Sequence, residues 1–240
     1  FIGESRHELI ITTKGYGAMG ENISEAGSSR KHLVRSLDDS LKRLKTDYVD
    51  IYFIHRYDPQ TGIEELLRTL DDFVRCGKVL SVGVSNYAAW QIEKLLGTAR
   101  LHHLIPIQCI QPMYNLAKRQ VEVEILPMAQ EERLGVISYS PLGGGLLTGR
   151  YGVGKNPRKG RLVENPTYIA RYQGESFERI ASRFVEYAQN RNLLPSSLAV
   201  AWAASNPAVT APIIGAANLN QLADSLASVD IRIDKQMKQE

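Results

Sequence analysis

Residues 48–55, YVDIYFIH, form an apolar run that ends in a histidine. Apolar side chains occupy both faces of the run, as expected for a parallel strand that helices cover on both sides. Four further apolar runs also end in polar residues, so that the five run ends are Lys14, His55, Ser85 with Asn86, Gln111 and Tyr139. Their separations of 41, 30, 26 and 28 residues are close to the length of one strand–helix–strand unit. Polar groups that recur at strand ends in this way predict a (β/α)8 barrel enzyme.

The rest of the chain also alternates between strand-like and helix-like stretches. Apolar runs of strand type are expected at 8–14, 48–55, 79–84, 105–110, 136–139 and 210–214. Amphipathic helices are expected at 33–44, 63–77, 88–96, 123–130, 176–189, 196–204 and 219–226. A closed (β/α)8 barrel has eight strands and about 250 residues. We therefore predict one α/β barrel domain over residues 1–240 that holds about six of the eight strands and is incomplete at its N-terminus.

The composition is that of a globular protein, with 43% hydrophobic and 23% charged residues and a net charge of +3. The basic excess is too small and too scattered to indicate nucleic-acid binding. No apolar run reaches the 18 residues that a membrane span needs. Cys76 and Cys109 have no second cysteine or histidine at metal-ligand spacing. We therefore predict two small buried residues, no metal site and a reducing, cytoplasmic location.

Residues 151–175, YGVGKNPRKGRLVENPTYIARYQGE, form the one long polar stretch. A loop of this length in a compact domain is usually either a functional flap or disordered. The sequence leaves both interpretations open.

Lys14 and His55 are the candidate catalytic residues. A histidine at the C-terminal end of a barrel strand is typical of a catalytic group, although a structural imidazole is an alternative for one histidine taken alone. A lysine that directly follows an apolar run is costly to desolvate, and such lysines shift their pKa or activate a neighbour. The two residues on consecutive strands together favour an enzyme. The remaining histidines, which we expect at the surface, are His7, His32, His102 and His103.

Polar groups at the later strand ends suggest a ligand site. Ser85, Asn86 and Gln111 are suited to bind a flat ligand that bears an amide. For Ser85 and Asn86 the alternative is a turn with an N-cap for the next helix. Tyr139 offers an aromatic face, and the glycines of 140–150, SPLGGGLLTGR, allow close approach to a phosphate beside Arg150. Residues 212–218, PIIGAAN, lead into a helix whose N-terminal amides suit an anion.

Two common nucleotide motifs are not supported. Residues 149–155, GRYGVGK, match the first seven positions of a P-loop, but Asn156 stands where a serine or threonine would hold magnesium. No Gly-x-Gly-x-x-Gly pattern follows a strand with an acidic residue about twenty positions further on, so a Rossmann site is not indicated.

Six stretches together resemble the aldo-keto reductase superfamily: ITTKGYG, RLKTDYVDIYFIH, GKVLSVGVSNY, IQPMYN, VISYSPLGGGLLTGRY and PIIGAANLNQL. The resemblance extends from Leu9 to about Leu226. The sequences of these stretches are most similar to the aryl-alcohol dehydrogenase-like and potassium-channel β-subunit branches. It implies a (β/α)8 barrel that binds NADP(H) without a Rossmann domain. It also implies an Asp-Tyr-Lys-His tetrad, in which Lys14 is the lysine and His55 the histidine.

The resemblance also implies the cofactor contacts. The matching residues are Ser85, Asn86 and Gln111 for the nicotinamide carboxamide, Tyr139 for ring stacking, Ser140, Leu142, Gly144 and Arg150 for the pyrophosphate strap, and Gly215, Ala217, Gln221 and Ser225 for the adenosine end. Ala217 stands where relatives often carry arginine or serine, so NAD(H) is an alternative cofactor. The tetrad aspartate and tyrosine belong upstream of the lysine, yet the 13 residues before Lys14 contain neither, which is why we expect an incomplete N-terminus.

The sequence therefore predicts an NADP(H)-dependent oxidoreductase that reduces a small-molecule aldehyde or ketone, with neither nucleic acid nor membrane as a partner. Two alternatives remain: a nucleotide-sensing regulatory subunit and a catalytically inactive barrel fragment. The sequence indicates neither the particular carbonyl substrate nor the oligomeric state.

Overall fold

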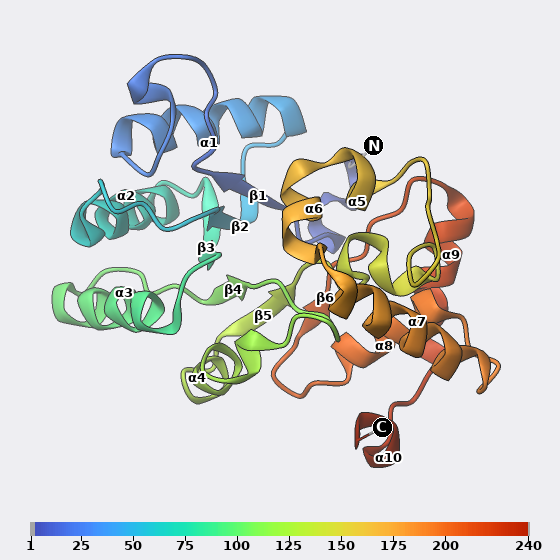
Figure 1. Ribbon diagram of the computed structural model, residues 1–240. Helices are drawn as coiled ribbons and strands as arrows, with labels where there is room; N and C mark the ends of the chain where they lie inside the picture. Colours follow the sequence, from blue (N-terminus) through green and yellow to red (C-terminus); the bar gives the residue numbers. More distant parts are fainter. Residues whose placement is uncertain (1–2, 240) are drawn as a thin grey trace. The chain divides into compact units, whose positions relative to one another are not determined.

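The computed structural model describes residues 3–239, with side chains for residues 3–238. The chain divides into two compact units (Figure 1). Unit 1 comprises Phe1–Gln111 and Met128–Gly135, and unit 2 comprises Pro112–Pro127 and Val136–Glu240. The assignment of residues 1–240 to a single barrel domain stays a prediction.

Unit 1 is built on four parallel strands in the order of the sequence. The strands are β1 (Thr12–Gly15), β2 (Val49–Ile54), β3 (Val79–Ser85) and β4 (Cys109–Gln111). The helices between them are α1 (Arg30–Leu44), α2 (Ile63–Arg75) and α3 (Ala89–His102), with short 3-10 turns η1 (Gly3–Glu8) and η2 (Ile23–Glu25). The helices lie together along one side of the strands (Figure 1). This β-α-β order confirms the predicted alternation in unit 1.

The sequence explains why α1 forms and how it packs. The Ser29 hydroxyl accepts a hydrogen bond from the His32 backbone N–H, which starts the helix as an N-cap. Leu33, Leu37 and Leu41 are buried at helical spacing, as predicted. The helix ends at Lys45 in the left-handed conformation, with φ of 54°.

The register of the strands sets where the polar residues lie. Lys14 pairs with Phe53, and Ser85 pairs with Gln111. Because all four strands are parallel, their carboxyl ends lie at one edge of the sheet. The polar residues that end the apolar runs of unit 1 therefore lie at that same edge of the sheet.

Unit 2 contains a parallel pair of short strands and most of the remaining helices. Strand β5 (Gly135–Ser138), whose first residue belongs to unit 1, pairs through Ile137 with Ala211 of β6 (Ala211–Pro212). The other elements are η3 (Gln120–Glu122), α4 (Ile125–Glu131, which continues into unit 1), η4 (Gly143–Thr148), α5 (Arg161–Glu164), α6 (Pro166–Tyr172), α7 (Glu175–Gln189), α8 (Pro195–Ala204), α9 (Leu219–Leu226), η5 (Ala227–Asp230) and α10 (Lys235–Gln239).

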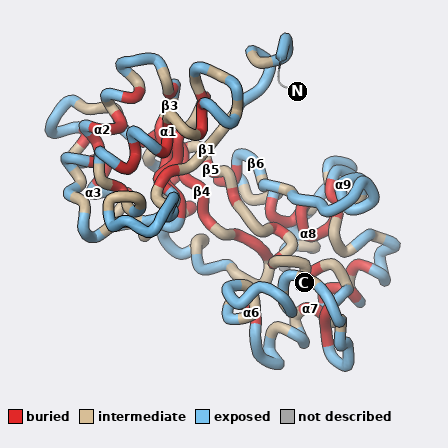
Figure 2. The backbone as a smooth tube through the Cα atoms, turned by 90° about the horizontal axis from the view of Figure 1, so that it is seen from above, coloured by how far each residue is buried: buried red, intermediate tan, exposed pale blue. Residues whose placement is uncertain are grey.

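The core of unit 2 joins η4 to the two long helices. Leu147 of η4 packs with Phe184 of α7 and Leu198 of α8 in one buried cluster. Figure 2 shows buried residues along the strands of unit 1 and along α7 and α8 of unit 2. The glycine-containing segment η4 is therefore anchored to the hydrophobic core of unit 2 through Leu147.

The polar stretch 151–175 differs from the expected loop because it contains α5 and α6. Asn165 accepts a hydrogen bond from the Tyr168 N–H and Pro166 occupies the first helical turn, so α6 has both start signals. Tyr172 at its end is 5% exposed and packs in a cluster with Leu146. This burial orders a segment whose composition alone suggested a flap or disorder.

Three strands are shorter than expected. β1 begins at Thr12 rather than at residue 8, because Glu8 ends the 3-10 turn η1. β4 begins at Cys109 rather than near residue 105, and Pro106 in that stretch has no N–H to donate to a neighbouring strand. β6 spans only Ala211–Pro212, although backbone hydrogen bonds from Thr210 and Ile213 to the neighbouring strand β5 continue its ladder on both sides.

Two surface and burial predictions are wrong. His32 is 1% exposed, because α1 buries His32, Ser36 and Ser40 beside the leucines, a wider face than the leucine pattern shows. Cys76 is exposed, since it lies just beyond the end of α2, whereas Cys109 is buried as predicted.

Within residues 3–239, no helix is both long and apolar enough to cross a membrane.

Candidate functional site

Lys14 lies on β1 with its side chain half-buried. Its ammonium group is 5.7 Å from the centroid of the Phe53 ring on the neighbouring strand. Burial lowers the pKa of Lys14, because a charged ammonium is less stable away from water. A cation in this setting favours an anion close to it, which is the electrostatic basis for activating an acidic group.

His55 follows β2 directly, and its backbone N–H donates to the Gly15 carbonyl at 3.0 Å. Its pKa is lowered, first by partial burial and then by the positive charges of Lys14 and Arg56. Because Lys14 pairs with Phe53 and the next residue, Gly15, accepts from the His55 N–H, the two candidate catalytic residues lie at the same edge of the sheet on neighbouring strands. An imidazole with a lowered pKa is neutral at neutral pH, so it donates a hydrogen bond through one ring N–H.

The lowered pKa of His55 makes folding stability depend on pH. In the unfolded chain His55 titrates near its ordinary pKa of 6.5, whereas the folded protein takes up that proton at lower pH. As the pH falls below 6.5, the unfolded state is protonated first, so the free energy of unfolding decreases until the folded-state pKa is passed. We expect His55→Gln to reduce the loss of stability between about pH 7 and pH 5 in urea unfolding. Wild type measured in the same way is the reference, and an unchanged pH slope in His55→Gln would contradict the assignment.

Ser85 and Asn86 tie three strand ends together. The Ser85 hydroxyl donates to the Gln111 carbonyl at 2.7 Å. The Asn86 side-chain amide donates to the Ser85 hydroxyl at 3.0 Å and to the His55 carbonyl at 2.9 Å. Asn86 adopts a left-handed backbone with φ of 58°, a conformation that asparagine tolerates better than most residues. These bonds fix the edge around His55 before any ligand arrives.

The alternative role of Ser85 and Asn86 as a helix cap is wrong. Helix α3 has Ala88 as its N-cap, and the Ala88 N–H is bonded by the Gln91 side chain at 2.9 Å. Gln111 is 4% exposed, and its backbone carbonyl accepts the Ser85 hydroxyl.

Unit 2 contains a pocket of about 720 Å³, which we call the strap pocket. All nine cofactor candidates of this unit line it: Tyr139, Ser140, Leu142, Gly144, Arg150, Gly215, Ala217, Gln221 and Ser225. These residues come from the end of β5, from η4 and the turn after it, and from the segment of β6 and α9. Residues predicted one stretch at a time are therefore brought together.

The glycines of η4 are needed for its shape. Gly144 has φ of 70°, and a Cβ atom there would lie 2.5 Å from the Tyr168 ring. Tyr168 belongs to α6, and its hydroxyl lies 3.3 Å from the Ser140 hydroxyl. The Asn115 side-chain amide donates to the Ser140 carbonyl at 2.9 Å. Because Gly144 has no Cβ atom, the Tyr168 ring of α6 can pack directly against η4.

Two arginines give the strap pocket positive charge. Arg150 and Arg161 both line it, and neither forms an ion pair with a described carboxylate. The Arg161 guanidinium lies 5.2 Å from the Tyr168 ring centroid. Asp224 also lines the pocket, so the positive charge is partly opposed.

Arg161 and Tyr168 were not predicted as site residues. Both lie in the polar stretch 151–175, whose basic composition was the available signal. Their place in the pocket depends on the contact between Tyr168 and Gly144, which spans 24 residues of sequence and has no local pattern.

The far end of the strap pocket is organised by the start of α9. The Asn218 side chain accepts from the Gln221 N–H at 3.0 Å as the N-cap of α9, and the Gln221 side chain accepts from the Ala217 N–H at 2.9 Å. Ser225 is 1% exposed, and its hydroxyl has no hydrogen-bond partner in residues 3–238. A buried hydroxyl without a partner beside a pocket is a group that a polar ligand can satisfy.

The strap pocket has the size and lining of a small-molecule site. Its volume lies within the range of about 300 to 1,000 Å³ that small-molecule sites occupy. It combines positive-φ glycine backbone, two unpaired guanidinium groups, an aromatic ring and an unsatisfied buried hydroxyl. These are groups that bind phosphate, stack on a ring and accept polar substituents. The part of the chain that the structure describes has no cluster of three or more histidine, cysteine, aspartate or glutamate residues placed to hold a metal.

Comparison with known proteins matches the chain to one family model and to several relatives. The aldo/keto reductase family model matches residues 1–240. The chain is 34% identical to the uncharacterized oxidoreductase YrpG of Bacillus subtilis, over 98% of this chain and 71% of that protein. It is 36% identical to a probable voltage-gated potassium channel subunit beta of Arabidopsis thaliana, over 96% of this chain and 71% of that protein. It is 35% identical to L-glyceraldehyde 3-phosphate reductase of Escherichia coli, over 94% of this chain and 66% of that protein.

Proposed function

This chain belongs to the aldo/keto reductase family, and we propose that it reduces aldehydes or ketones to alcohols with NADP(H). Its parallel strands and alternating helices are those of a partial (β/α)8 barrel. The observation that carries the proposal is the strap pocket, where all nine cofactor candidates of unit 2 line one cavity of nucleotide size. The oxidoreductase names of relatives from Bacillus subtilis and Escherichia coli support the reaction class.

The residues of the strap pocket have distinct roles in this proposal. Bound NADPH supplies the hydride. Arg150 and the backbone of η4 hold its pyrophosphate, and Tyr139 stacks on its nicotinamide ring. The segment from Gly215 to Ser225 receives the adenosine end. Because Ala217 contributes no charge to a 2′-phosphate, NAD(H) is the alternative cofactor to be compared in every assay.

Residues of unit 1 hold polar groups and assist the proton donor. The family resemblance implies that this donor is a tyrosine upstream of Lys14, and residues 1–13 contain no tyrosine. Ser85, Asn86 and Gln111 hold the nicotinamide carboxamide, and Asn86 also fixes the His55 carbonyl. Neutral His55 donates a hydrogen bond to the substrate carbonyl oxygen, where negative charge develops during reduction. The Lys14 ammonium stabilises the deprotonated form of the proton donor, which lowers the pKa of that donor.

The direct test is NADPH consumption with an aromatic aldehyde, followed by absorbance, with the alcohol product identified by chromatography. In a protein that carries the tyrosine donor upstream of Lys14, we expect alcohol to form in a one-to-one ratio with oxidised cofactor. NADPH binding without any alcohol would remove the reductase proposal and leave a nucleotide-binding role.

Arg150→Gln tests the cofactor role of the strap. Loss of one charge-assisted phosphate contact should raise the NADPH dissociation constant by about 10-fold or more. At saturating cofactor, kcat should stay within about two-fold of wild type, because Arg150 does not contact the reacting carbonyl. The exposed Arg158 does not line the pocket, so Arg158→Gln is the charge-matched control. Equal NADPH affinities for the two variants would contradict the assignment.

A second candidate function is a nucleotide-sensing regulatory subunit. The similarity to potassium channel beta subunits of plants favours it specifically. This function predicts tight NADPH binding with turnover too slow to support metabolism. A single-turnover measurement of hydride transfer from bound NADPH separates a slow sensor from a working reductase.

A further inference from the structure

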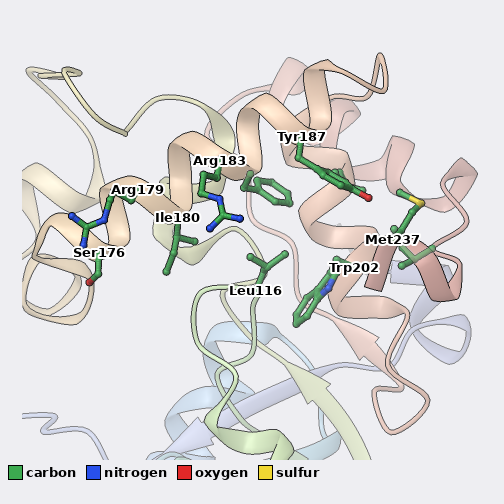
Figure 3. A pocket seen from close by; sticks show the side chains of 11 residues that line it. Leu116, Ser176, Arg179, Ile180, Arg183, Tyr187, Trp202 and Met237 are labelled. Carbon is green, nitrogen blue, oxygen red and sulfur yellow. The ribbon is translucent and has the colours of Figure 1, made fainter. Parts of the chain in front are cut away.

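Unit 2 has a second pocket of about 520 Å³ that the proposed function does not use (Figure 3). It lies between α7 and α8, with Leu116 and the C-terminal residues Ile233 and Met237 completing its wall; we call it the α7–α8 pocket. It shares no lining residue with the strap pocket. The α7–α8 pocket is therefore a separate site.

The inner wall of the α7–α8 pocket is apolar and well packed. Phe184, Leu198 and Trp202 are all less than 10% exposed. Phe184 and Leu198 also belong to the buried cluster that contains Leu147. This wall is part of the core of unit 2, so it is formed before a ligand binds and costs little ordering.

The charged residues that line the α7–α8 pocket are all positive. Arg179 and Arg183 line it, and no aspartate or glutamate does. Arg179 lies 3.2 Å from Glu175 in a pair whose two side chains are more than half exposed, and such surface pairs contribute little. Arg183 forms no hydrogen bond or ion pair with the described residues. In Figure 3 its side chain points from α7 into the space above Leu116 and Trp202.

We propose that the α7–α8 pocket binds an amphipathic monocarboxylate, with its apolar body against Phe184, Leu198 and Trp202 and its carboxylate on Arg183. The apolar wall offers no hydrogen-bond donors to replace the water around a small, strongly hydrated anion, so it favours a ligand with an apolar body. An unpaired guanidinium at its edge favours a carboxylate, whose planar geometry it matches with two parallel hydrogen bonds. A second copy of the chain is a poorer occupant, because a symmetric contact through this face would bring the arginines of the two copies together.

The test uses decanoate as the probe and Trp202 as the reporter. The chain has two tryptophans, and Trp90 lies in unit 1 and is 59% exposed. A Trp90→Phe background therefore leaves Trp202 as the single indole signal. We expect saturable quenching or a spectral shift with decanoate and at least about 10-fold weaker binding of decanol, which lacks the charge.

Arg183→Gln separates charge recognition from general hydrophobic binding. In this variant the decanoate affinity should fall about 10-fold while the decanol affinity stays within about two-fold, which also shows that the pocket remains folded. Arg158→Gln removes the same charge away from the pocket and should change neither affinity. The proposal is overturned if decanoate does not bind, if decanol binds equally well, or if Arg183→Gln and Arg158→Gln behave alike.

Discussion

Replacement of Lys14 by methionine, in a protein that also carries the tyrosine donor upstream of Lys14, is expected to lower kcat for carbonyl reduction by about 100- to 10,000-fold, the range for loss of a group that assists proton transfer. Methionine keeps most of the length of the side chain and its contact with Phe53, but it removes the positive charge. Without that charge the proton donor returns to a higher pKa and protonates the developing alkoxide less effectively. Steady-state kinetics at saturating NADPH measure the effect.

The affinity for NADPH should be nearly unchanged in Lys14→Met, because Lys14 is assigned to the proton donor and not to the cofactor. Lys31→Met is the matched control, since Lys31 is an exposed lysine on α1 outside the polar edge of β1–β4. The assignment is wrong if Lys14→Met and Lys31→Met have similar kcat values, or if Lys14→Met loses NADPH binding in parallel with turnover.

The loss of the Lys14 charge should also change the pKa of His55. Lys14 is one of the two charges that lower the pKa of His55, after burial. We therefore infer that Lys14→Met raises the pKa of His55 toward its ordinary value, visible as a shift of the imidazole signals in an NMR titration. This shift ties the kinetic effect to the polar edge of unit 1 and not to a distant change of structure.

The strand ends were predictable because their pattern is local. A buried strand such as β2 needs a continuous apolar run, and the first polar residue after it marks the edge of the sheet. The polar residue at the end of each apolar run therefore identified Lys14, Ser85 and Gln111 near the carboxyl ends of their strands, and His55 directly after its strand. Helix caps depend on local sequence in the same way, as Ser29 before α1 and Asn218 before α9 show.

The parts that were missed depend on contacts distant in sequence. Tyr172 orders α6 through burial against Leu146, and polar neighbours in the sequence hide that contact. His32 is buried because Ser36 and Ser40 are small enough for α1 to bury a wide face, which a count of leucines does not reveal. Arg161 reaches the strap pocket only because α6 closes on Gly144. Tertiary packing, not propensity, decides each of these positions.

Gly144→Ala is expected to destabilise the protein by about 2 to 4 kcal/mol and to weaken NADPH binding at least about 10-fold. Alanine is strained at a φ of 70°, and its Cβ would lie 2.5 Å from the Tyr168 ring. The ring cannot move aside easily, because the guanidinium groups of Arg161 and Arg171 lie 5.2 and 5.3 Å from its centroid. The clash should therefore displace α6 or the strap, which changes the pocket wall.

Gly154→Ala separates backbone strain from the clash. Gly154 has a similar φ of 73°, but a Cβ atom there would meet nothing within 4 Å. We expect Gly154→Ala to cost about 1 kcal/mol and to leave NADPH affinity unchanged. Urea unfolding gives the stabilities, and quenching of protein fluorescence by NADPH gives the affinities.

A double-mutant cycle with Tyr168→Ala completes the test. If the clash with Tyr168 causes the larger part of the effect, Gly144→Ala should cost much less stability in the Tyr168→Ala background than in wild type. A favourable coupling of about 1 kcal/mol or more is expected for residues in direct contact. Additive effects, or equal costs for Gly144→Ala and Gly154→Ala, would mean that α6 does not close against the strap. In that case the role of Arg161 in the pocket would also be lost, because α5 and α6 position it there.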